Sequence, residues 1–290
     1  FIATTGVKQK RVASESVTSS DLCFEAAEKL IAELNWEKAE IDALVFVTQS
    51  PDYRTPASSC ILQDRLGLPQ SCFTLDISLG CSGWVYGLSV IASLMQSGGI
   101  RRGLLLAGDT VLKMCSSEDK STYPLFGDAG TCTAVEFDPE AFPMTFAMHT
   151  DGSGAEAIIV PSGGFRNRES PESFEMVDYG EGIVRNSLQV SMEGMSVFTF
   201  GISKAPKVVN ELLGVIGENS NFTFHQANLF MNEKIRKKLK LHEEQVPYSL
   251  DEFGNTSCAS IPLTLVVRCA DVLRFRKLRH VGCGFGVGLS

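Results

Sequence analysis

Three polar residues in separate segments could together carry out acyl-transfer chemistry. They are Cys81 in DISLGCSGWVYGL, His225 in FTFHQANLF and Asn255 in FGNTSCASIPL. A cysteine thiolate can attack an acyl carbonyl and hold the acyl group as a thioester. Histidine and asparagine side chains can donate hydrogen bonds to the enolate or oxyanion that develops next. The three residue types therefore predict thioester chemistry, with an electrostatic role for the asparagine because its amide does not titrate.

Cys81 lies between an apolar run and a helix-like run, flanked by Gly80 and Ser82. A thiol at the first turn of a helix faces unpaired backbone N–H groups and the positive end of the helix dipole. Both favour the thiolate, so we expect a reactive sulfur. The alternative is a small buried hydrophobic residue, since free cysteine is among the most buried residue types. That alternative suits the other eight cysteines better; Cys258 is the only one of them near another candidate motif.

His225 and Asn255 occupy positions where functional groups are often presented. His225 ends a short apolar run, and strand ends are where α/β sheets hold ligands. Asn255 follows Gly254 in a turn that opens a helix-like run. A structural histidine and an ordinary Gly-Asn turn are the alternatives for each residue taken alone.

The elements that must position these residues alternate along the chain. Helical spacing or helix-stop signals predict helices over 21–34, 55–68, 82–99, 197–216, 227–241 and 260–275. Short apolar runs predict strands over 41–50, 72–78, 103–112, 127–138, 221–226 and 280–290. The segment 150–190 is rich in Gly, Ser, Pro and charge, which predicts loops. This order predicts an α/β fold with mostly covered sheets, built from two halves of the same pattern.

Composition limits the classes of partner. The chain has 290 residues, 44% hydrophobic and 21% charged, which is typical of a globular protein. A net charge of −8 argues against nucleic acid as the main partner. No apolar run reaches the ~18 residues of a membrane span, and no secretion signal is recognisable. Nine cysteines without CxxC pairs predict reduced thiols, a cytoplasmic location and no metal site.

The three segments together resemble the ketoacyl-acyl-carrier-protein synthase III family of the thiolase superfamily. DISLGCSGWVYGL is similar to the nucleophile segment of that family, HQAN to its histidine segment and GNTSCASIPL to its asparagine segment. FGDAGTCTAV and GFGVGLS are similar to motifs near the end of each half. The resemblance covers essentially the whole chain, and HQAN followed by GNTS-x-ASIPL is its most specific part.

The resemblance implies a thiolase-like, five-layered αβαβα fold. Its two similar halves would be residues 1–150, carrying the cysteine, and 151–290, carrying the histidine and asparagine. The first strand and helix of the family would precede Phe1, and its last strand would continue beyond Ser290. It also implies a homodimer and no cofactor, with acyl-CoA and malonyl-acyl carrier protein as substrates.

The same resemblance implies a mechanism. Cys81 would take an acyl group from acyl-CoA, and malonyl-acyl carrier protein would then lose CO2 against His225 and Asn255. The carbanion would attack the acyl-cysteine and release a 3-oxoacyl-carrier protein, which initiates fatty acid synthesis. The backbone N–H groups of Cys81 and Val287 would form the oxyanion hole.

Positions near the substrate depart from the best-known bacterial members of the family. Thr4 and Phe230 stand where arginines contact CoA and the carrier protein, and Met195 stands where an asparagine lies along the CoA tunnel. Thr55 matches a position that reaches across the dimer to shape the acyl pocket of the partner. We therefore expect Thr55, Met195 and Phe198 to line the substrate pocket.

The run EKIRKKLKL follows HQAN and gives an acidic chain one cationic helix face. An acidic carrier protein could be steered to this face. The residues expected to dock it are Lys234, Arg236, Lys237 and Lys238, together with Lys240. A solvated helix face without a partner is the alternative.

Two other functional readings stay open from the sequence. A papain-type cysteine protease also has Cys, His and Asn in this order, and GCSGW is similar to its cysteine segment; the alternating strands and helices argue against it. The second alternative keeps the fold but transfers the acyl group within specialised metabolism, with a different donor or acceptor. A catalytically inactive scaffold would not explain three polar groups in three motifs.

Overall fold

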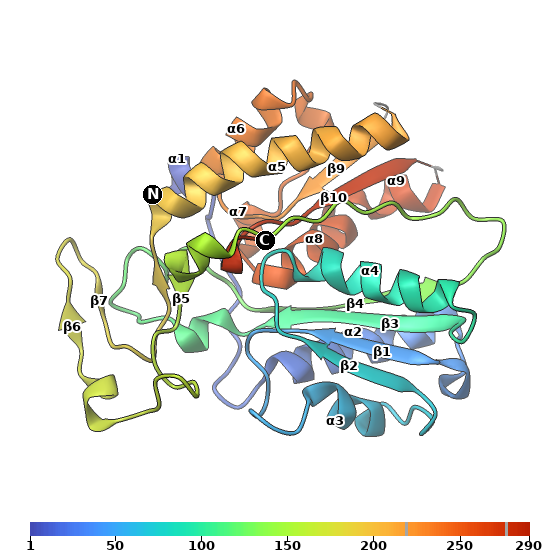
Figure 1. Cartoon of the computed structure of the whole chain (residues 1–290), viewed down its shortest axis with the longest axis horizontal. Coiled ribbons are helices and arrows are strands. Elements are labelled where there is room, and N and C mark those ends of the chain that lie inside the picture. Colours follow the sequence, from blue (N-terminus) through green and yellow to red (C-terminus); the bar gives the residue numbers. More distant parts are fainter. Residues whose placement is uncertain (218–219, 276–277) are drawn as a thin grey trace.

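The computed structural model describes residues 1–217, 220–275 and 278–290, and its elements are arranged in layers (Figure 1). The helices are α1 (Ile2–Thr5), α2 (Ser19–Leu34), α3 (Ser58–Arg65), α4 (Gly83–Gln96), α5 (Gly194–Ile216), α6 (Leu229–Lys238), α7 (Leu250–Phe253), α8 (Ser260–Thr264) and α9 (Ala270–Phe275). The strands are β1 (Ala43–Val47), β2 (Phe73–Ile77), β3 (Arg102–Asp109), β4 (Ala129–Glu136), β5 (Ile158–Ile159), β6 (Val177–Asp178), β7 (Val184–Arg185), β8 (Ser191–Met192), β9 (Ser220–Phe224) and β10 (Arg279–Cys283).

The first sheet has the strand order β2-β1-β3-β4, parallel except for β4. Alternate residues of its central strands point to opposite faces. Leu44 and Phe46 of β1 pack with α2 and α3 on one face, while Val45 and Val47 pack with α4 on the other. Both faces are therefore covered, which explains the continuous apolar runs in these strands.

The second sheet consists of the parallel pair β9 and β10 among the described residues. Phe222 and Phe224 of β9 pack against the inward faces of α5 and α6. On the opposite face, α8 contacts β9, and Trp84 of α4 lies against Gly282 of β10. Helices α4 and α8 thus lie between the two sheets, and the order of layers is α, β, α, β, α (Figure 1).

Local signals account for where several elements begin. Helix α2 is capped by Thr18, which forms a capping box with Asp21. Cys23, Ala27 and Ile31 then repeat at helical spacing on its buried side. The segment 150–190, expected to form loops, is mostly loop and contains two short 3₁₀ helices, Gly152–Ala157 and Pro171–Phe174. Its short strands pair as β5 with β8 and β6 with β7.

Three expected elements differ from the observed ones. The strand expected over 280–290 ends at Cys283, because GFGVGLS turns away to pack on the Cys81 segment and ends in a 3₁₀ turn, Val287–Leu289. The strand expected over 103–112 ends at Asp109. The helix expected over 260–275 contains a π-helical segment, Leu265–Cys269.

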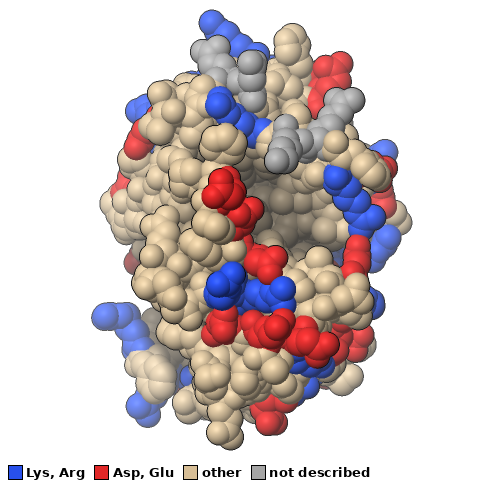
Figure 2. All heavy atoms as spheres, turned by 90° about the vertical axis from the view of Figure 1, so that its right-hand side faces the viewer, with Lys and Arg blue, Asp and Glu red and all other residues tan. Residues whose placement is uncertain are grey.

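On the face of the molecule that Figure 2 shows, the surface charge is mixed. Figure 2 shows acidic and basic side chains beside one another, around a hollow near the middle of the view. None of the described helices combines the length and the apolar character that a bilayer crossing requires.

Candidate active site

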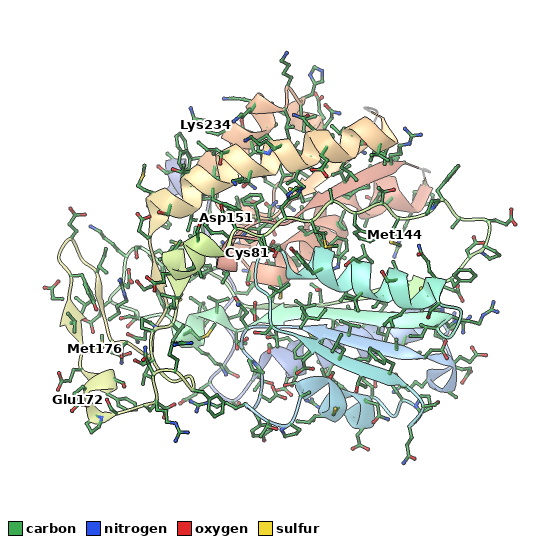
Figure 3. All side chains as sticks on the ribbon, viewed as in Figure 1. Cys81, Met144, Asp151, Glu172, Met176 and Lys234 are labelled. Carbon is green, nitrogen blue, oxygen red and sulfur yellow. The ribbon has the colours of Figure 1, made fainter. Side chains whose placement is uncertain are left out.

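Cys81, His225 and Asn255 line one cavity of about 500 Å³. Cys81 lies in the middle of the molecule, where the elements of the two halves meet (Figure 3). The remainder of the wall is mainly apolar and includes Val111, Leu125, Phe126, Ile158, Val160, Val190, Met192, Val197 and Met231. The fold therefore brings the three sequence-predicted residues to one site with room for an apolar ligand.

Cys81 lies in the turn between β2 and α4, two residues before the helix begins, and is 6% exposed. Burial raises the pKa of its thiol to about 11, although backbone N–H groups oppose that effect. The negative charge of Asp109 raises the pKa further. Burial therefore opposes the effect of the helix start, which we expected to favour the thiolate form of Cys81.

The glycine-rich loop after β10 packs directly on the nucleophile. A Cβ atom at Gly286 would lie only 2.5 Å from the Cys81 sulfur, so only glycine allows this approach. The backbone N–H groups of Val287 and of Cys81 itself both lower the pKa of the thiol. These are the two backbone donors that the family resemblance implies for an oxyanion hole.

His225 directly follows β9 and is 1% exposed. Its Nδ1 lies 2.7 Å from the Ser260 hydroxyl, and Asn232 donates to its backbone carbonyl at 3.0 Å. Burial lowers the pKa of the imidazole to about 3, while a contact with the Ser257 backbone opposes this shift. The ring is therefore neutral at physiological pH and held in one orientation.

Asn255 is 5% exposed. Its backbone N–H donates to Leu125 at 2.9 Å, and its side-chain oxygen accepts the N–H of Ser257 at 3.0 Å. The amide nitrogen donates one weak bond, 3.4 Å long, to the carbonyl of Ala227. Because an amide nitrogen carries two protons, Asn255 retains a donor for a ligand in the cavity.

The three expected pocket residues are not among those that line this cavity in the described chain. Met195 is 69% exposed at the start of α5, whereas its neighbours Gly194 and Val197 line the wall. Phe198 stacks on Phe230 with ring centroids 5.5 Å apart. Thr55 is exposed in the loop before α3, so it adds nothing to the cavity of its own chain.

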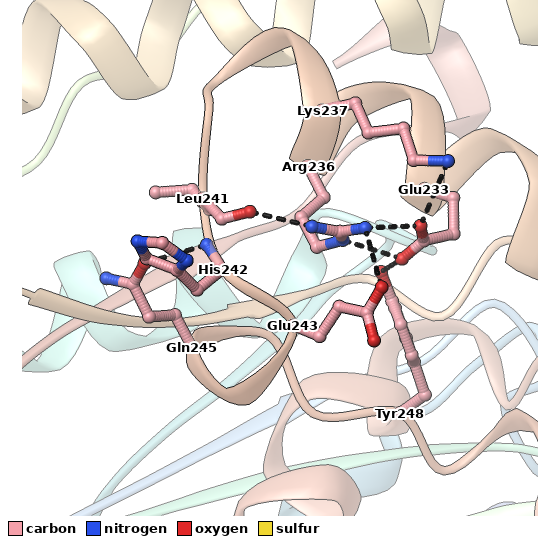
Figure 4. A network of polar contacts seen from close by, with 8 residues as sticks. All are labelled: Glu233, Arg236, Lys237, Leu241, His242, Glu243, Gln245 and Tyr248. Atoms are coloured by element: carbon pink, nitrogen blue, oxygen red, sulfur yellow. Dashed lines mark hydrogen bonds and ion pairs between the residues drawn. The ribbon is translucent and has the colours of Figure 1, made fainter.

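The cationic residues of α6 divide into two groups. Lys234, Lys237, Lys238 and Lys240 are exposed, and Lys237 forms only a long ion pair, 3.8 Å, with Glu233. Arg236 is buried and donates two 2.7–2.8 Å bonds to Glu233 and one to the carbonyl of Leu241 (Figure 4). Arg236 therefore does not fit its expected role in docking; it joins α6 to the chain that follows.

Some residues at the site were missed by sequence reasoning. Asp109, Ser260 and Gln49 line the cavity or touch its key side chains. Asp109 ends a strand, which is a signal that could have been used. Ser260 lies in the ASIPL motif, but its contact with an imidazole 35 positions away depends on the fold. No group of three or more potential metal ligands occurs in the described ranges 1–217, 220–275 and 278–290.

Comparisons with known proteins identify the family. The model of the 3-oxoacyl-[acyl-carrier-protein] synthase III family matches residues 75–152, and the model of its C-terminal part matches 217–290. The chain belongs to this family. It is therefore a condensing acyltransferase with the thiolase-like fold, and the papain-type alternative is wrong.

Individual relatives agree with this assignment over most of the chain. A beta-ketoacyl-[acyl-carrier-protein] synthase III from Caldanaerobacter subterraneus subsp. tengcongensis is 33% identical over 90% of this chain and 77% of its own length. The enzyme of that name from Enterococcus faecalis is 32% identical over 99% of this chain and 86% of its own length. The crystal structure of a 3-oxoacyl-(acyl-carrier-protein) synthase from Burkholderia xenovorans superimposes with a TM-score of 0.89, at 41% identity, and covers 99% of this chain and 82% of that one.

Proposed function

We propose that this protein is a 3-oxoacyl-acyl-carrier-protein synthase of type III that initiates fatty acid synthesis. In this proposal Cys81 accepts an acyl group from acyl-CoA, and the acyl-cysteine then condenses with malonyl-acyl carrier protein. The single observation that carries the proposal is the convergence of Cys81, His225 and Asn255 on one largely apolar cavity. We also propose that the chain consists of two thiolase-like halves, residues 1–150 and 151–290.

In the first step the Cys81 sulfur attacks the thioester carbonyl of the donor. The two backbone N–H groups that now meet the sulfur, from Cys81 and Val287, are close to where the carbonyl oxygen becomes negatively charged. When the tetrahedral intermediate collapses, the CoA thiolate leaves and takes up the proton that the Cys81 thiol has lost. The apolar wall accommodates the acyl chain.

In the second step His225 and Asn255 act as hydrogen-bond donors. We assign the proton of the neutral imidazole to Nε2, because the Ser260 hydroxyl, 2.7 Å from Nδ1, can then donate to that nitrogen. The Nε2–H and the free amide N–H would hold the thioester oxygen of malonyl-acyl carrier protein as CO2 leaves. The carbanion then attacks the acyl carbonyl, and Cys81 departs as the thiolate.

The carrier protein is proposed to dock on the exposed lysines of α6. Asn228 caps α6 and Met231 lies in its first turn, and both line the cavity, so the helix begins at the site. Lys234, Lys237 and Lys238 are exposed farther along. Because Arg236 is buried, the proposed docking set excludes it.

The nine cysteines are all free, which fits a reducing compartment such as the cytoplasm.

A homodimer is also proposed. Strand β2 is an edge of the first sheet and is only partly buried along its whole length, with Phe73 40% exposed. Open apolar edges are usually covered by another chain or element. The loop before α3 is tied to this edge, since Ser58 and Ser59 donate to Asp76 at 2.7 Å. Thr55 in that loop would then be available to a second copy.

Intact-mass spectrometry tests the proposal directly. The protein is incubated with acetyl-CoA and longer acyl-CoAs and then with malonyl-acyl carrier protein. We expect one acyl adduct on Cys81, lost when malonyl-acyl carrier protein is added and replaced by a 3-oxoacyl-carrier protein. Cys81→Ala removes the adduct, whereas His225→Ala and Asn255→Ala keep the adduct but stop condensation. Condensation at the wild-type rate by either of the last two variants contradicts their assigned roles.

A further inference from the structure

A buried carboxylate, Asp109, lies at the end of β3 and lines the cavity beside Cys81. It is 1% exposed, and among the ion pairs of the described chain none includes it. A buried carboxylate without a cation must be stabilised by hydrogen-bond donors. The identity of those donors indicates what Asp109 does.

One carboxylate oxygen holds the turn that follows β1. Oδ1 accepts the Thr48 hydroxyl at 2.9 Å, the N–H of Gln49 at 2.7 Å, and both the N–H and hydroxyl of Ser50 at 3.2 and 3.1 Å. The side chain of Gln49 lies against Gly80, where an added Cβ would be 2.5 Å from its Oε1. Through this turn, Asp109 supports the backbone that immediately precedes Cys81.

The other carboxylate oxygen reaches the second half of the molecule. Oδ2 accepts the thiol of Cys258 at 3.4 Å, and that sulfur also lies 3.4 Å from the carbonyl of Val47. Burial and the Asp109 carboxylate keep the pKa of Cys258 well above its usual value, so the thiol stays protonated and can donate. Cys258 lies in the 3₁₀ turn Ser257–Ala259, directly after the Asn255 segment.

The Asp109–Cys258 contact therefore joins the two segments that carry the reacting groups. Oδ1 of the carboxylate holds the turn after β1, which supports the backbone before Cys81, and Oδ2 holds the turn next to Asn255. A change of a few tenths of an ångström in either segment alters the angle between the acyl-sulfur and the amide donor. Because the condensation rate depends on how the reacting groups are oriented, such a change of angle should alter that rate.

We propose that Asp109 and Cys258 form a positioning pair that sets Asn255 relative to Cys81 across the two halves. Neither residue reacts with substrate. This inference rests on the proposed function, because the expected effect is a change in the rate of the condensation step.

The first test uses Cys258→Ala and Cys258→Ser. Alanine removes the donor to Oδ2, while serine restores a hydroxyl of similar size in its place. We expect Cys258→Ala to lower the kcat of condensation about tenfold, equivalent to ~1.4 kcal/mol, while the rate of Cys81 acylation stays within about twofold. We expect Cys258→Ser to recover condensation to within about threefold of the wild type.

Cys72→Ala is the matched control, because Cys72 is also buried but lies in the core beneath the first sheet, among α3 and its neighbours. It should leave condensation unchanged. If Cys258→Ala condenses normally, or if serine is as poor as alanine, the pair is not a positioning device. Loss of folding by the alanine variant does not block the test, since failure of a folded serine variant alone overturns the proposal.

A second test does not depend on enzymatic activity. Asp109→Asn keeps the shape of the side chain but removes its charge, so the rate of Cys81 alkylation by iodoacetamide should follow a profile shifted to lower pH. An unchanged profile would mean that the Asp109 carboxylate does not act on Cys81 as a neighbouring charge, and it would overturn the placement of Asp109 beside the nucleophile on which the proposal rests. If the wild type neither takes up an acyl group nor condenses, the proposed function fails, while the alkylation profile still reports on Asp109.

Discussion

At the scale of single residues, the site is governed by burial. Cys81 and His225 are both shifted toward their neutral forms, the thiol by a raised pKa and the imidazole by a lowered one. A neutral pair is suited to a cavity that receives a neutral thioester. On the carbonyl oxygen of the thioester, negative charge develops only during the reaction, when the backbone N–H groups and the Asn255 amide can stabilise it.

The first prediction concerns the reactivity of Cys81 toward iodoacetamide. Because the pKa of the thiol is raised to about 11, the thiolate is a small fraction at neutral pH. The alkylation rate should rise about tenfold per pH unit between pH 7 and 9, with no plateau. Peptide mass spectrometry measures the rate at Cys81 itself, and Cys81→Ala provides the blank. A plateau below pH 8 would show that the helix start prevails over burial.

At the scale of elements, α6 combines a structural face and an exposed cationic face. Arg236 is held by Glu233 and by the carbonyl of Leu241, and Tyr248 donates to Glu233 at 2.9 Å (Figure 4). These bonds fasten the end of α6 to the segment that leads into α7. Of the exposed lysines of the same helix, Lys237 has a long ion pair with Glu233, and Lys238 donates to the carbonyl of Ile202 at 3.1 Å.

The second prediction separates these two faces. Arg236→Ala should lower the free energy of unfolding by ~3 kcal/mol, because Glu233 loses its buried partner. Lys237→Ala is the matched control, and it should cost less than ~0.5 kcal/mol because its ion pair is exposed. Urea denaturation measures both values.

For carrier-protein binding, we expect Lys237→Ala to have the larger effect and Arg236→Ala the smaller one. Lys237→Ala should raise the KM for malonyl-acyl carrier protein several-fold, with a stronger effect at low salt. Arg236→Ala should change that KM little at a temperature where the variant is folded. If Arg236→Ala is as stable as the wild type, the network in Figure 4 is not structural.

The sequence was informative about elements whose signals are local. The spacing of Cys23, Ala27 and Ile31 identified α2, and the apolar run at Ala43–Val47 identified β1. The GFGVGLS segment was misassigned as strand because its path depends on contact with Cys81, which no local pattern records. The burial of Arg236 inside a charge run was missed for the same reason: charge pattern does not reveal which cation faces a buried carboxylate.

At the scale of the whole molecule, two histidines link folding to pH. Burial lowers the pKa of His225 to about 3 and that of His280 to about 4. The unfolded chain takes up protons at these residues below about pH 6.5, whereas the folded chain does not. The contribution of these two histidines to the free energy of unfolding is therefore fully present above pH 6.5, and it is lost as the pH falls toward 4.

The third prediction follows from this loss of stability as the pH falls. Between pH 6.5 and 4.5 the free energy of unfolding should fall, each of these two histidines contributing a slope of up to ~1.4 kcal/mol per pH unit. His280→Gln removes one titrating group that does not line the cavity, so it should halve the slope while preserving acylation of Cys81. Urea denaturation at four pH values measures the slope. An unchanged slope in His280→Gln would mean that His280 is not buried as a neutral ring.

The fourth prediction concerns the edge strand β2 and the proposed homodimer. Phe73 donates its backbone N–H to Asp42, and Ile77 accepts the N–H of Thr48, so the odd-numbered residues face β1. The N–H of Thr74 therefore points outward from the sheet. Thr74→Pro removes this outward donor without disturbing a bond to β1, and proline is tolerated at such edge positions.

We expect the wild type to sediment as a dimer and Thr74→Pro to shift toward monomer at micromolar concentration. Thr74→Val is the control, because valine keeps both the N–H and the β-branched shape, and it should remain dimeric. If Thr55 of one copy shapes the acyl pocket of the other, the proline variant should also accept acyl-CoA chains less selectively. A dimeric Thr74→Pro with wild-type selectivity would place the contact between copies away from β2, because the outward N–H groups of that strand would then be unnecessary for association.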